Sequence, residues 1–417
     1  MPFVESDRVA LRNLAQRVAQ IAAEPLMAQR RQRWVEHNSL RCSYPLMLVF
    51  PEGSWQELLP EESLRCTEER ARHIERNLRM RIYSYEHFSD DTVVEGEWVV
   101  NKIIHSSGWG LEPQRVASPD PRGAWLFDPV IKTPGDLEQL KHPQIAYDEA
   151  STLAELAEMQ DLFGDLLDVR LVGVGRLSYH LMNQYTALRG LEEVMVDMYD
   201  QPQMLHDAMA FLAEGHRGVL RQYVEQDLLS FNNDNTYHSS GGNSHTDQLP
   251  LADADPDRAR PCDMWASAEA QEMAAVSPEQ HEEFALAYER RLLEPFGLTG
   301  YGCCEDLTKK LDRVFTIPHI RRISISPFAD VELCAPQLQG DYIFSWKPNP
   351  AHLVGGFDLE EIREYVRCTI RAAAEHGCVL EMILKDTHTC EHHPERFDQW
   401  THVAREVILD KAGAAPN

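Results

Sequence analysis

Short apolar runs alternate along this chain with longer stretches of helical periodicity. Eight of these runs have the length of a buried strand. They cover Pro45–Phe50, Trp98–Ile104, Arg170–Gly175, Leu228–Asn232, Leu298–Cys303, Arg322–Ser326, Tyr342–Ser345 and Val379–Leu384. Strands that alternate with helices are typical of parallel sheets with right-handed crossovers. Eight of them predict an α/β fold in which a single (β/α)8 barrel, the TIM barrel, closes on itself.

The stretches between the strands carry the signals that begin and end helices. Ser277 and Gln280 form a capping box with Pro278 at the first helical position, and Gly297 ends that stretch before the next strand. No glycine-rich motif for a dinucleotide or a phosphate follows any of the strands. This pattern favours the closed barrel over an open doubly wound sheet.

Two segments depart from the repeat. Residues 1–40 are predicted to form a helical arm, interrupted at Pro25, that packs outside the main core, and residues 41–417 are predicted to form the barrel. Residues 235–270 form a polar stretch, rich in Gly, Asp and Pro, that is too long for a simple connection. Because it follows the fourth strand, we expect this long loop at the barrel mouth, either as a lid or as a surface excursion.

The charge of the chain narrows the range of functions. Among 417 residues, 67 Asp and Glu outweigh 40 Lys and Arg, which gives a formal net charge of −27. Such a charge repels phosphate backbones and anionic lipids, so we expect no binding to nucleic acid or membranes. No apolar run approaches the roughly 18 residues of a membrane span, and the first residues lack a signal-peptide pattern. With nine scattered cysteines, an odd number, we expect a cytoplasmic protein with reduced thiols.

The most unusual string lies at the end of the fifth predicted strand, where Cys303 and Cys304 precede Glu305 and Asp306. Two thiols and two carboxylates together can ligate a metal, or one thiol can serve as a nucleophile. The alternative is structural: Cys303 fills the core, and the two carboxylates favour the positive end of the next helix. The residue types leave both interpretations open.

A second string follows the eighth predicted strand and contains Asp386, His388 and Cys390. In a closed barrel the fifth and eighth strands end at the same mouth. His388 or Cys390 can therefore approach Cys303 and complete a zinc site that keeps one position open for water or substrate.

Polar residues at the ends of other strands complete the set of candidates. Asp234 after the fourth strand and Lys347 after the seventh are the preferred pair, because a buried lysine beside a carboxylate can bind an anionic substrate group. The predicted catalytic residues are Asp234, Glu305, Lys347 and Asp386. The predicted substrate-binding residues are Tyr301, Trp265, His238 and Asn233. The predicted metal ligands are Cys303, Cys304, His388 and Cys390.

Six short strings occur in an order and spacing that are specific as a set. They are Arg170–Arg176, Arg189–Glu192, Leu298–Glu305, Ser324–Pro327, Lys347–Pro350 and Pro394–Arg396. Together they resemble the uroporphyrinogen decarboxylase superfamily over most of the chain, from about Tyr44 to Leu409. The resemblance implies a single (β/α)8 barrel, as in the decarboxylase itself and in the corrinoid-dependent methyltransferases.

The resemblance also implies two kinds of site. In the methyltransferase branch, a His-x-Cys on the fifth strand and a Cys after the eighth bind a zinc ion that activates a thiol. Here Cys303 matches the first cysteine, Tyr301 stands where the histidine is expected, and the third ligand falls within Thr387–Cys390. In the decarboxylase branch an arginine-rich segment follows the first strand, whereas Phe50–Trp55 in this chain is acidic.

We therefore expect a small-molecule methyltransferase of the corrinoid- or thiol-dependent type. Zinc is the metal that the resemblance implies, and a corrinoid protein is the implied methyl-donor partner. A decarboxylase or lyase acting on a carboxylated small molecule is the alternative, and a barrel that binds a ligand without turnover is the third interpretation. If the chain assembles, we expect a homodimer.

Overall fold

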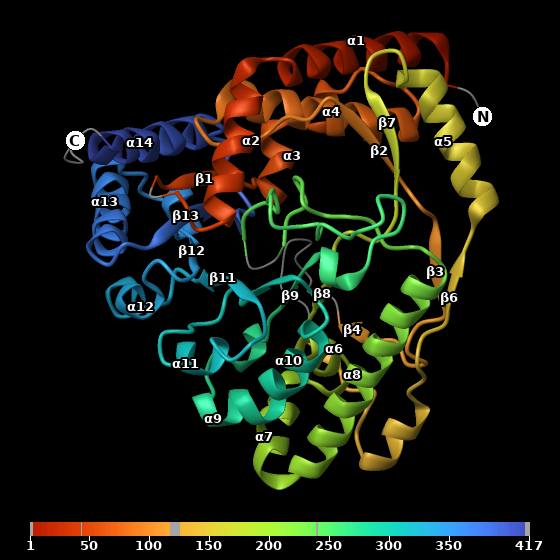
Figure 1. Ribbon diagram of the computed structural model, residues 1–417, viewed down its shortest axis with the longest axis vertical. Helices are drawn as coiled ribbons and strands as arrows, with labels where there is room; N and C mark the ends of the chain where they lie inside the picture. The colour runs from red at the N-terminus through yellow and green to blue at the C-terminus, as the bar shows by residue number, and fades with distance from the viewer. Residues whose placement is uncertain (1–2, 43, 117–125, 239–240, 413–417) are drawn as a thin grey trace.

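The computed structural model describes residues 3–42, 44–116, 126–238 and 241–412. Its central element is a seven-stranded sheet in which neighbouring strands run parallel, in the order β1-β13-β12-β11-β10-β9-β8 (Figure 1). These strands are β1 (Leu46–Val49), β8 (Ser178–Tyr179), β9 (Trp265–Ala268), β10 (Leu298–Tyr301), β11 (Ile320–Ile325), β12 (Ile343–Trp346) and β13 (Val379–Leu384). The protein is thus a mixed α/β fold with a parallel central sheet.

Smaller sheets lie beside the central one. β2 pairs in parallel with β7, and two antiparallel pairs join β3 to β6 and β4 to β5. Their bounds are β2 (Glu97–Asn101), β3 (Ile104–Ser106), β4 (Gln114–Val116), β5 (Leu126–Asp128), β6 (Ile145–Tyr147) and β7 (Asp168–Val172). Within the described residues no ladder connects β8 to β1, so the sheet is consistent with a barrel-like fold but is not shown to close.

Seven of the eight predicted strands correspond to β1, β2, β7, β10, β11, β12 and β13. The prediction for Leu228–Asn232 is wrong, because the only pairing described for this run is a single parallel bridge from Leu229 to Val174. The run Trp265–Ala268 instead forms β9, which lies between β10 and the edge strand β8. Its sequence, Trp-Ala-Ser-Ala, has little apolar bulk, so its strand conformation depends on pairing with β8 and β10.

Helices cover the outer face of the sheet because the outward side chains of the strands are apolar. Ile323, Ile325, Phe344 and Trp346 alternate with polar residues and belong to the main core. The N-cap half of the predicted capping box is confirmed, since the Ser277 side chain accepts a hydrogen bond at 3.3 Å from the backbone N–H of Gln280. The helices of this layer are α6 (Leu181–Arg189), α7 (Leu191–Asp200), α8 (Pro202–Glu225), α9 (Pro278–His281), α10 (Ala287–Leu293), α11 (Leu311–Val314), α12 (Val331–Leu338), α13 (Leu359–Glu375) and α14 (Glu395–Ala412).

The N-terminal arm consists of two helices, and the predicted break at Pro25 is confirmed. α1 packs against α4 and α5, and together with β2 and β7 these helices enclose a second hydrophobic core (Figure 1). The helices of this part are α1 (Glu5–Ala22), α2 (Pro25–Asn38), α3 (Trp55–Leu58), α4 (Glu69–His87) and α5 (Glu149–Phe163). None of the helices within the described ranges has both the length and the apolar composition needed to cross a bilayer.

The inner face of the central strands is polar, and its side chains are nevertheless buried. Arg322 on β11, Ser345 on β12 and Glu381 on β13 point away from the apolar outer face, and Lys347 and Lys385 continue the same alternation past the strand ends. Buried polar groups need partners, because an unpaired one costs about 1–3 kcal/mol. The inner face therefore has to be covered by other polar groups of the chain.

Two segments cover this inner face. Gly242 lies so close to it that a Cβ atom there would be 2.5 Å from Arg322 Nη2 and from Glu381 Oε2. The end of α2 reaches the same place, where His37 Nε2 lies 3.2 Å from Glu381 Oε2. The expectation that the N-terminal arm packs outside the main core is therefore wrong for the last turn of α2.

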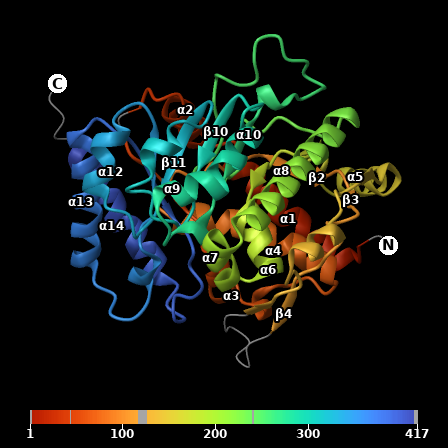
Figure 2. The ribbon, with the colours of Figure 1, turned by 90° about the horizontal axis from the view of Figure 1, so that it is seen from below.

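The expectation that residues 235–270 form one continuous loop is also wrong, whereas their role as a lid stays a prediction. Residues 241–246 are buried against the inner face of the sheet, and the last part of the segment contains β9. Between them, residues 247–258 are mostly exposed and form the surface excursion that was the alternative (Figure 2). Positions 239 and 240 of this segment lie outside the described residues.

Candidate active site

Four reactive side chains meet where β10 and β13 end. Cys303 and Cys304 follow β10, and Lys385 and Asp386 follow β13. The Sγ atoms of the two cysteines are 3.5 Å apart, and Lys385 Nζ lies 3.4 Å from Cys303 Sγ. Asp386 completes the group, with Oδ2 at 3.6 Å from Cys304 Sγ and Oδ1 at 3.5 Å from Lys385 Nζ. We call these four residues the thiol cluster.

One thiol of the pair ionises more readily than the other. The hydrogen bond from Cys303 to Cys304 lowers the pKa of the Cys304 thiol and raises the pKa of the Cys303 thiol. Burial and the Asp386 carboxylate oppose the ionisation of Cys304, whereas the Lys385 ammonium favours it. Cys304 is also partly exposed, while Cys303 is buried. These shifts favour Cys304 over Cys303 as the thiol that ionises, and the thiolate is the nucleophilic form.

The turn that carries the thiols is held by Glu305. This buried carboxylate accepts hydrogen bonds from the backbone N–H of Cys303 at 2.8 Å and of Ala270 at 3.2 Å. Gly302 has a φ of 91°, a conformation that favours glycine at the point where the chain leaves β10. Burial and the nearby Glu269 carboxylate raise the pKa of Glu305. The structure thus gives Glu305, predicted as a catalytic residue, a positioning role.

Lys347 is buried on the inner face, where Nζ donates hydrogen bonds to Ser345 O at 3.0 Å and to Ser345 Oγ at 2.8 Å. Burial lowers the pKa of Lys347 to about 7, although the Glu381 carboxylate acts in the opposite direction. The predicted partner Asp234 instead accepts hydrogen bonds from Thr236 N at 2.8 Å and Thr236 Oγ1 at 2.7 Å. The carboxylate near Lys347 is therefore Glu381, and Asp234 closes a local turn.

Arg322 and Glu381 form the centre of a buried network beneath the thiol cluster. Arg322 Nε donates to Glu381 Oε1 at 3.0 Å, and Arg322 Nη2 donates to Asn38 Oδ1 at 2.6 Å. Burial raises the pKa of Glu381, but Arg322 and the neighbouring His37 outweigh it and lower this pKa to about 2. The network fixes the positions of β11, β13 and α2 relative to one another.

The predicted substrate-binding residues do not converge on the thiol cluster. The Tyr301 hydroxyl faces the outer helices and donates to Glu289 Oε2 at 2.8 Å. Trp265 is a buried residue of β9, and the Arg322 guanidinium lies 5.1 Å from its ring centroid. His238 is fully buried, which lowers its pKa to about 3, and Asn233 Nδ2 donates to Leu249 O at 2.8 Å. In an extended strand Tyr301 and Cys303 would share one face, but β10 ends at Tyr301 and the chain turns at Gly302, whose φ is 91°, so the two side chains point in different directions.

The four predicted metal ligands do not form one ligand set in the structure. Cys390 Sγ donates to Glu57 Oε2 at 3.1 Å, and His388 is exposed. In the described part of the chain, no group of three or more His, Cys, Asp or Glu side chains is placed to hold a metal ion. The Lys385 ammonium already supplies a positive charge beside Cys303. These residues do not fit a zinc ion, and no step of the mechanism below uses one.

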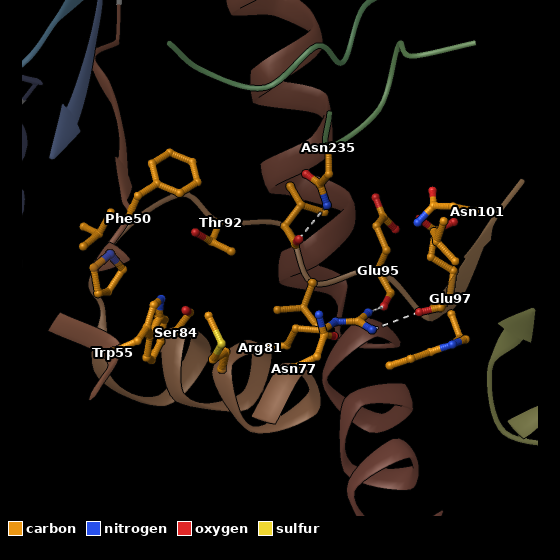
Figure 3. A pocket seen from close by; sticks show the side chains of 17 residues that line it. Phe50, Trp55, Asn77, Arg81, Ser84, Thr92, Glu95, Glu97, Asn101 and Asn235 are labelled. Atoms are coloured by element: carbon orange, nitrogen blue, oxygen red, sulfur yellow. Dashed lines mark hydrogen bonds between the residues drawn. The ribbon is translucent and has the colours of Figure 1, made fainter. Parts of the chain in front are cut away.

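A cavity of about 520 Å³ opens near the thiol cluster, between β1, α4 and β2 (Figure 3). Phe50 and Trp55 form one end of it, and Arg81 lies toward the other end, where it donates to Glu97 O at 2.9 Å. The Phe50 ring centroid lies 4.5 Å from that of Tyr237, whose buried hydroxyl is close enough to Lys385 and Cys303 to sense their charges. None of the four residues of the thiol cluster lines the cavity, so it is a candidate binding pocket that is linked to the cluster only through Phe50 and Tyr237.

Two important residues had no role in the sequence-based hypotheses. Lys385 lay in the second string, and Tyr237 lay in the presumed lid. A signal for Lys385 exists, because Glu381, Ile383 and Lys385 are spaced by two and must share one face if β13 is extended. No such signal exists for Tyr237, since residues 235–238 and 241–246 form no regular element.

The chain was compared with family models, with curated proteins and with solved structures. No family model matches the chain, and no curated protein matches it. Among solved structures, a methyltransferase from Methanosarcina mazei overlaps with a TM-score of 0.37 and 13% sequence identity, over 64% of this chain and 72% of that one. An overlap of this size carries no conclusion about fold or reaction. The resemblance to the uroporphyrinogen decarboxylase superfamily stays a prediction.

Proposed function

We propose that this protein is an enzyme that transfers a methyl group of a small molecule in a thiol-dependent reaction, with Cys304 as the nucleophile. The observation that carries the proposal is the 3.4 Å contact between Lys385 Nζ and Cys303 Sγ, which in turn lies 3.5 Å from Cys304 Sγ. A cation beside two thiols stabilises a thiolate at neutral pH, and a thiolate attacks electrophilic carbon. The cluster also lies at the carboxyl ends of parallel strands, where barrel enzymes place their catalytic groups.

In this mechanism the Cys304 thiolate displaces the leaving group from the methyl carbon of the donor. The S–C bond forms, the bond from carbon to the leaving group breaks, and its electron pair stays with the leaving group. Asp386, at 3.6 Å, accepts the thiol proton beforehand, and Lys385 balances the negative charge. A corrinoid protein stays part of the proposal as the partner that donates the methyl group.

The test is to look for the methylated cysteine. Wild type, Cys304→Ser and Cys368→Ser are incubated with methylcobalamin, S-adenosylmethionine and methylated amines, and their peptides are analysed by mass spectrometry. We expect a methyl group on Cys304 in wild type and Cys368→Ser. Cys368 is the matched control because it is a partly exposed thiol on α13. Absence of methylated Cys304 with all donors, or equal methylation of Cys368, contradicts the proposal.

A decarboxylase or lyase is the second candidate, and Lys347 is the observation that favours it. A buried lysine with a pKa of about 7 can donate a proton at neutral pH to the carbanion left when carbon dioxide departs. The test is the release of carbon dioxide from small carboxylated substrates. If Lys347→Met loses this activity while Cys304→Ser keeps it, decarboxylation is favoured over methyl transfer.

A further inference from the structure

A second group of polar side chains lies where β8 and β9 end. Ser178 Oγ lies 2.7 Å from His180 Nε2, and His180 Nδ1 lies 2.5 Å from Glu269 Oε1. Parallel pairing brings the three together, because Ser178 stands opposite Ser267 in the register of β8 and β9. His180 and Glu269 follow these two strands directly, and Glu269 N donates to Tyr179 O at 3.1 Å.

The contacts determine where the protons lie. A carboxylate only accepts, so the neutral His180 ring carries its proton on Nδ1, facing Glu269. Nε2 is then an acceptor, and the Ser178 hydroxyl donates to it. Ser267 Oγ lies 2.8 Å from Ser178 Oγ and donates to that oxygen in turn. Ser178 is thus oriented to lose its proton to His180.

Glu269 and His180 differ in how far they are exposed to solvent, and this difference suits proton transfer between Ser178 and His180. The Glu269 side chain is 3% exposed and the His180 side chain 34% exposed, so the carboxylate is shielded while the imidazole reaches solvent. Ser178 and His180 line a cavity of about 420 Å³, whose apolar wall includes Trp109 and Leu111. A substrate bound in this cavity therefore meets both the hydroxyl and the imidazole.

We propose that Ser178 and His180, positioned by Glu269, form a second catalytic site that hydrolyses esters with a small apolar acyl group. Ser178 Oγ attacks the acyl carbon while His180 Nε2 takes the hydroxyl proton. The bond from the acyl carbon to the alcohol oxygen breaks, and His180 returns the proton to that oxygen. Water then attacks the acyl-serine through the same histidine and releases the carboxylic acid. Glu269 keeps the imidazole in the required tautomer.

A fluorophosphonate probe tests the reactivity of Ser178 without any variant. The probe labels serines whose proton is removed by an adjacent base, and peptide mapping of labelled wild type shows which serine carries the adduct. We expect the adduct on Ser178. A wild-type protein that stays unlabelled, or an adduct on another serine, overturns the proposal.

Hydrolysis of 4-nitrophenyl acetate and butyrate tests turnover. All variants carry Cys304→Ser, because thiols also react with these esters and the thiol cluster is a separate hypothesis. Ser178→Ala and His180→Gln are expected to lower kcat/KM at least about 100-fold, while Ser63→Ala, an exposed serine far from the site in sequence, leaves it unchanged. Thermal unfolding confirms that each variant is folded, and unchanged turnover in folded Ser178→Ala overturns the proposal.

The variant Glu269→Gln tests whether Glu269 positions the His180 imidazole or only fills space. The amide keeps the size of the carboxylate but no longer favours imidazolium, so we expect kcat to fall while KM changes little and the pH dependence of kcat to shift. A pH profile identical to that of wild type would show that Glu269 only fills space, which contradicts its part in the relay.

Discussion

Lys385 Nζ and Cys303 Sγ lie 3.4 Å apart, although 82 positions separate the two residues in the sequence. Their strands, β13 and β10, are not neighbours, since β12 and β11 lie between them. In a flat sheet three strand spacings would separate them by about 14 Å. The sheet therefore curves around the thiol cluster, and this curvature brings the ammonium to the thiols.

Cys304 is expected to react with iodoacetamide faster than Cys368 at neutral pH. The hydrogen bond from Cys303 lowers the pKa of Cys304, whereas burial raises the pKa of Cys368. Because the thiolate is the reactive form, the rate at Cys304 should level off at a lower pH than the rate at Cys368. Labelling followed by peptide mapping over a range of pH measures both rates, and equal profiles would contradict the assignment.

Lys385→Met is expected to slow the alkylation of Cys304 about tenfold at neutral pH, because loss of the ammonium raises the pKa of the thiol. Lys385→Arg should restore most of the rate, since it keeps the charge. Lys309→Met, at an exposed lysine, is the matched control and should leave the rate unchanged. A rate in Lys385→Met equal to that of wild type would exclude Lys385 from the activation of Cys304.

Glu381→Gln is expected to lower the free energy of unfolding by about 3–5 kcal/mol, because it leaves the buried Arg322 guanidinium without its counter-charge. Glu279→Gln, which removes the mostly exposed partner of Arg313, should cost far less, because solvent screens a surface ion pair. Urea unfolding of both variants measures the difference. Similar losses in the two variants would mean that the buried network contributes no more than a surface pair.

Glu57→Gln is expected to make stability less dependent on pH in acid. Although burial raises the pKa of Glu57, hydrogen bonds from Thr389, His392 and Cys390 outweigh it and lower this pKa to about 2. A carboxyl group with a depressed pKa in the folded state stabilises the protein fully above its unfolded pKa of about 4.5 and loses this contribution as the pH falls to about 2. Unfolding measured at about pH 6 and about pH 3 should show a larger difference between wild type and variant at the higher pH.

Metal analysis decides whether zinc assists the reaction. Because the described residues form no ligand set, we expect the purified protein to hold well below one zinc per chain. Treatment with a chelator should then leave the alkylation of Cys304 unchanged. If the protein holds stoichiometric zinc, and if Cys303→Ala loses it while Cys390→Ala keeps it, the hypothesis of a zinc site at Cys303 is supported and our expectation is wrong.

The candidate site was only partly predictable from the sequence. The pairing of Cys303 and Cys304 with the segment after the eighth strand was foreseen, because both strings directly follow strands that run the same way. The residue of that segment that contacts Cys303 was not foreseen, since the sequence analysis favoured His388 and Cys390 over Lys385. Which residue of a short irregular loop turns inward depends on contacts such as the one between Cys390 and Glu57, more than 300 positions away.

The sequence by itself determined seven of the eight predicted strands, the helix begun by Ser277 and the alternation of polar and apolar residues along β11, β12 and β13, because each of these follows from local periodicity and capping. Only the tertiary structure decided that the polar face is the inner one and that residues 241–246 and the end of α2 cover it. Local patterns show that a strand has two faces. Which face is enclosed depends on contacts between distant segments, whose combined burial and hydrogen bonding decide the fold.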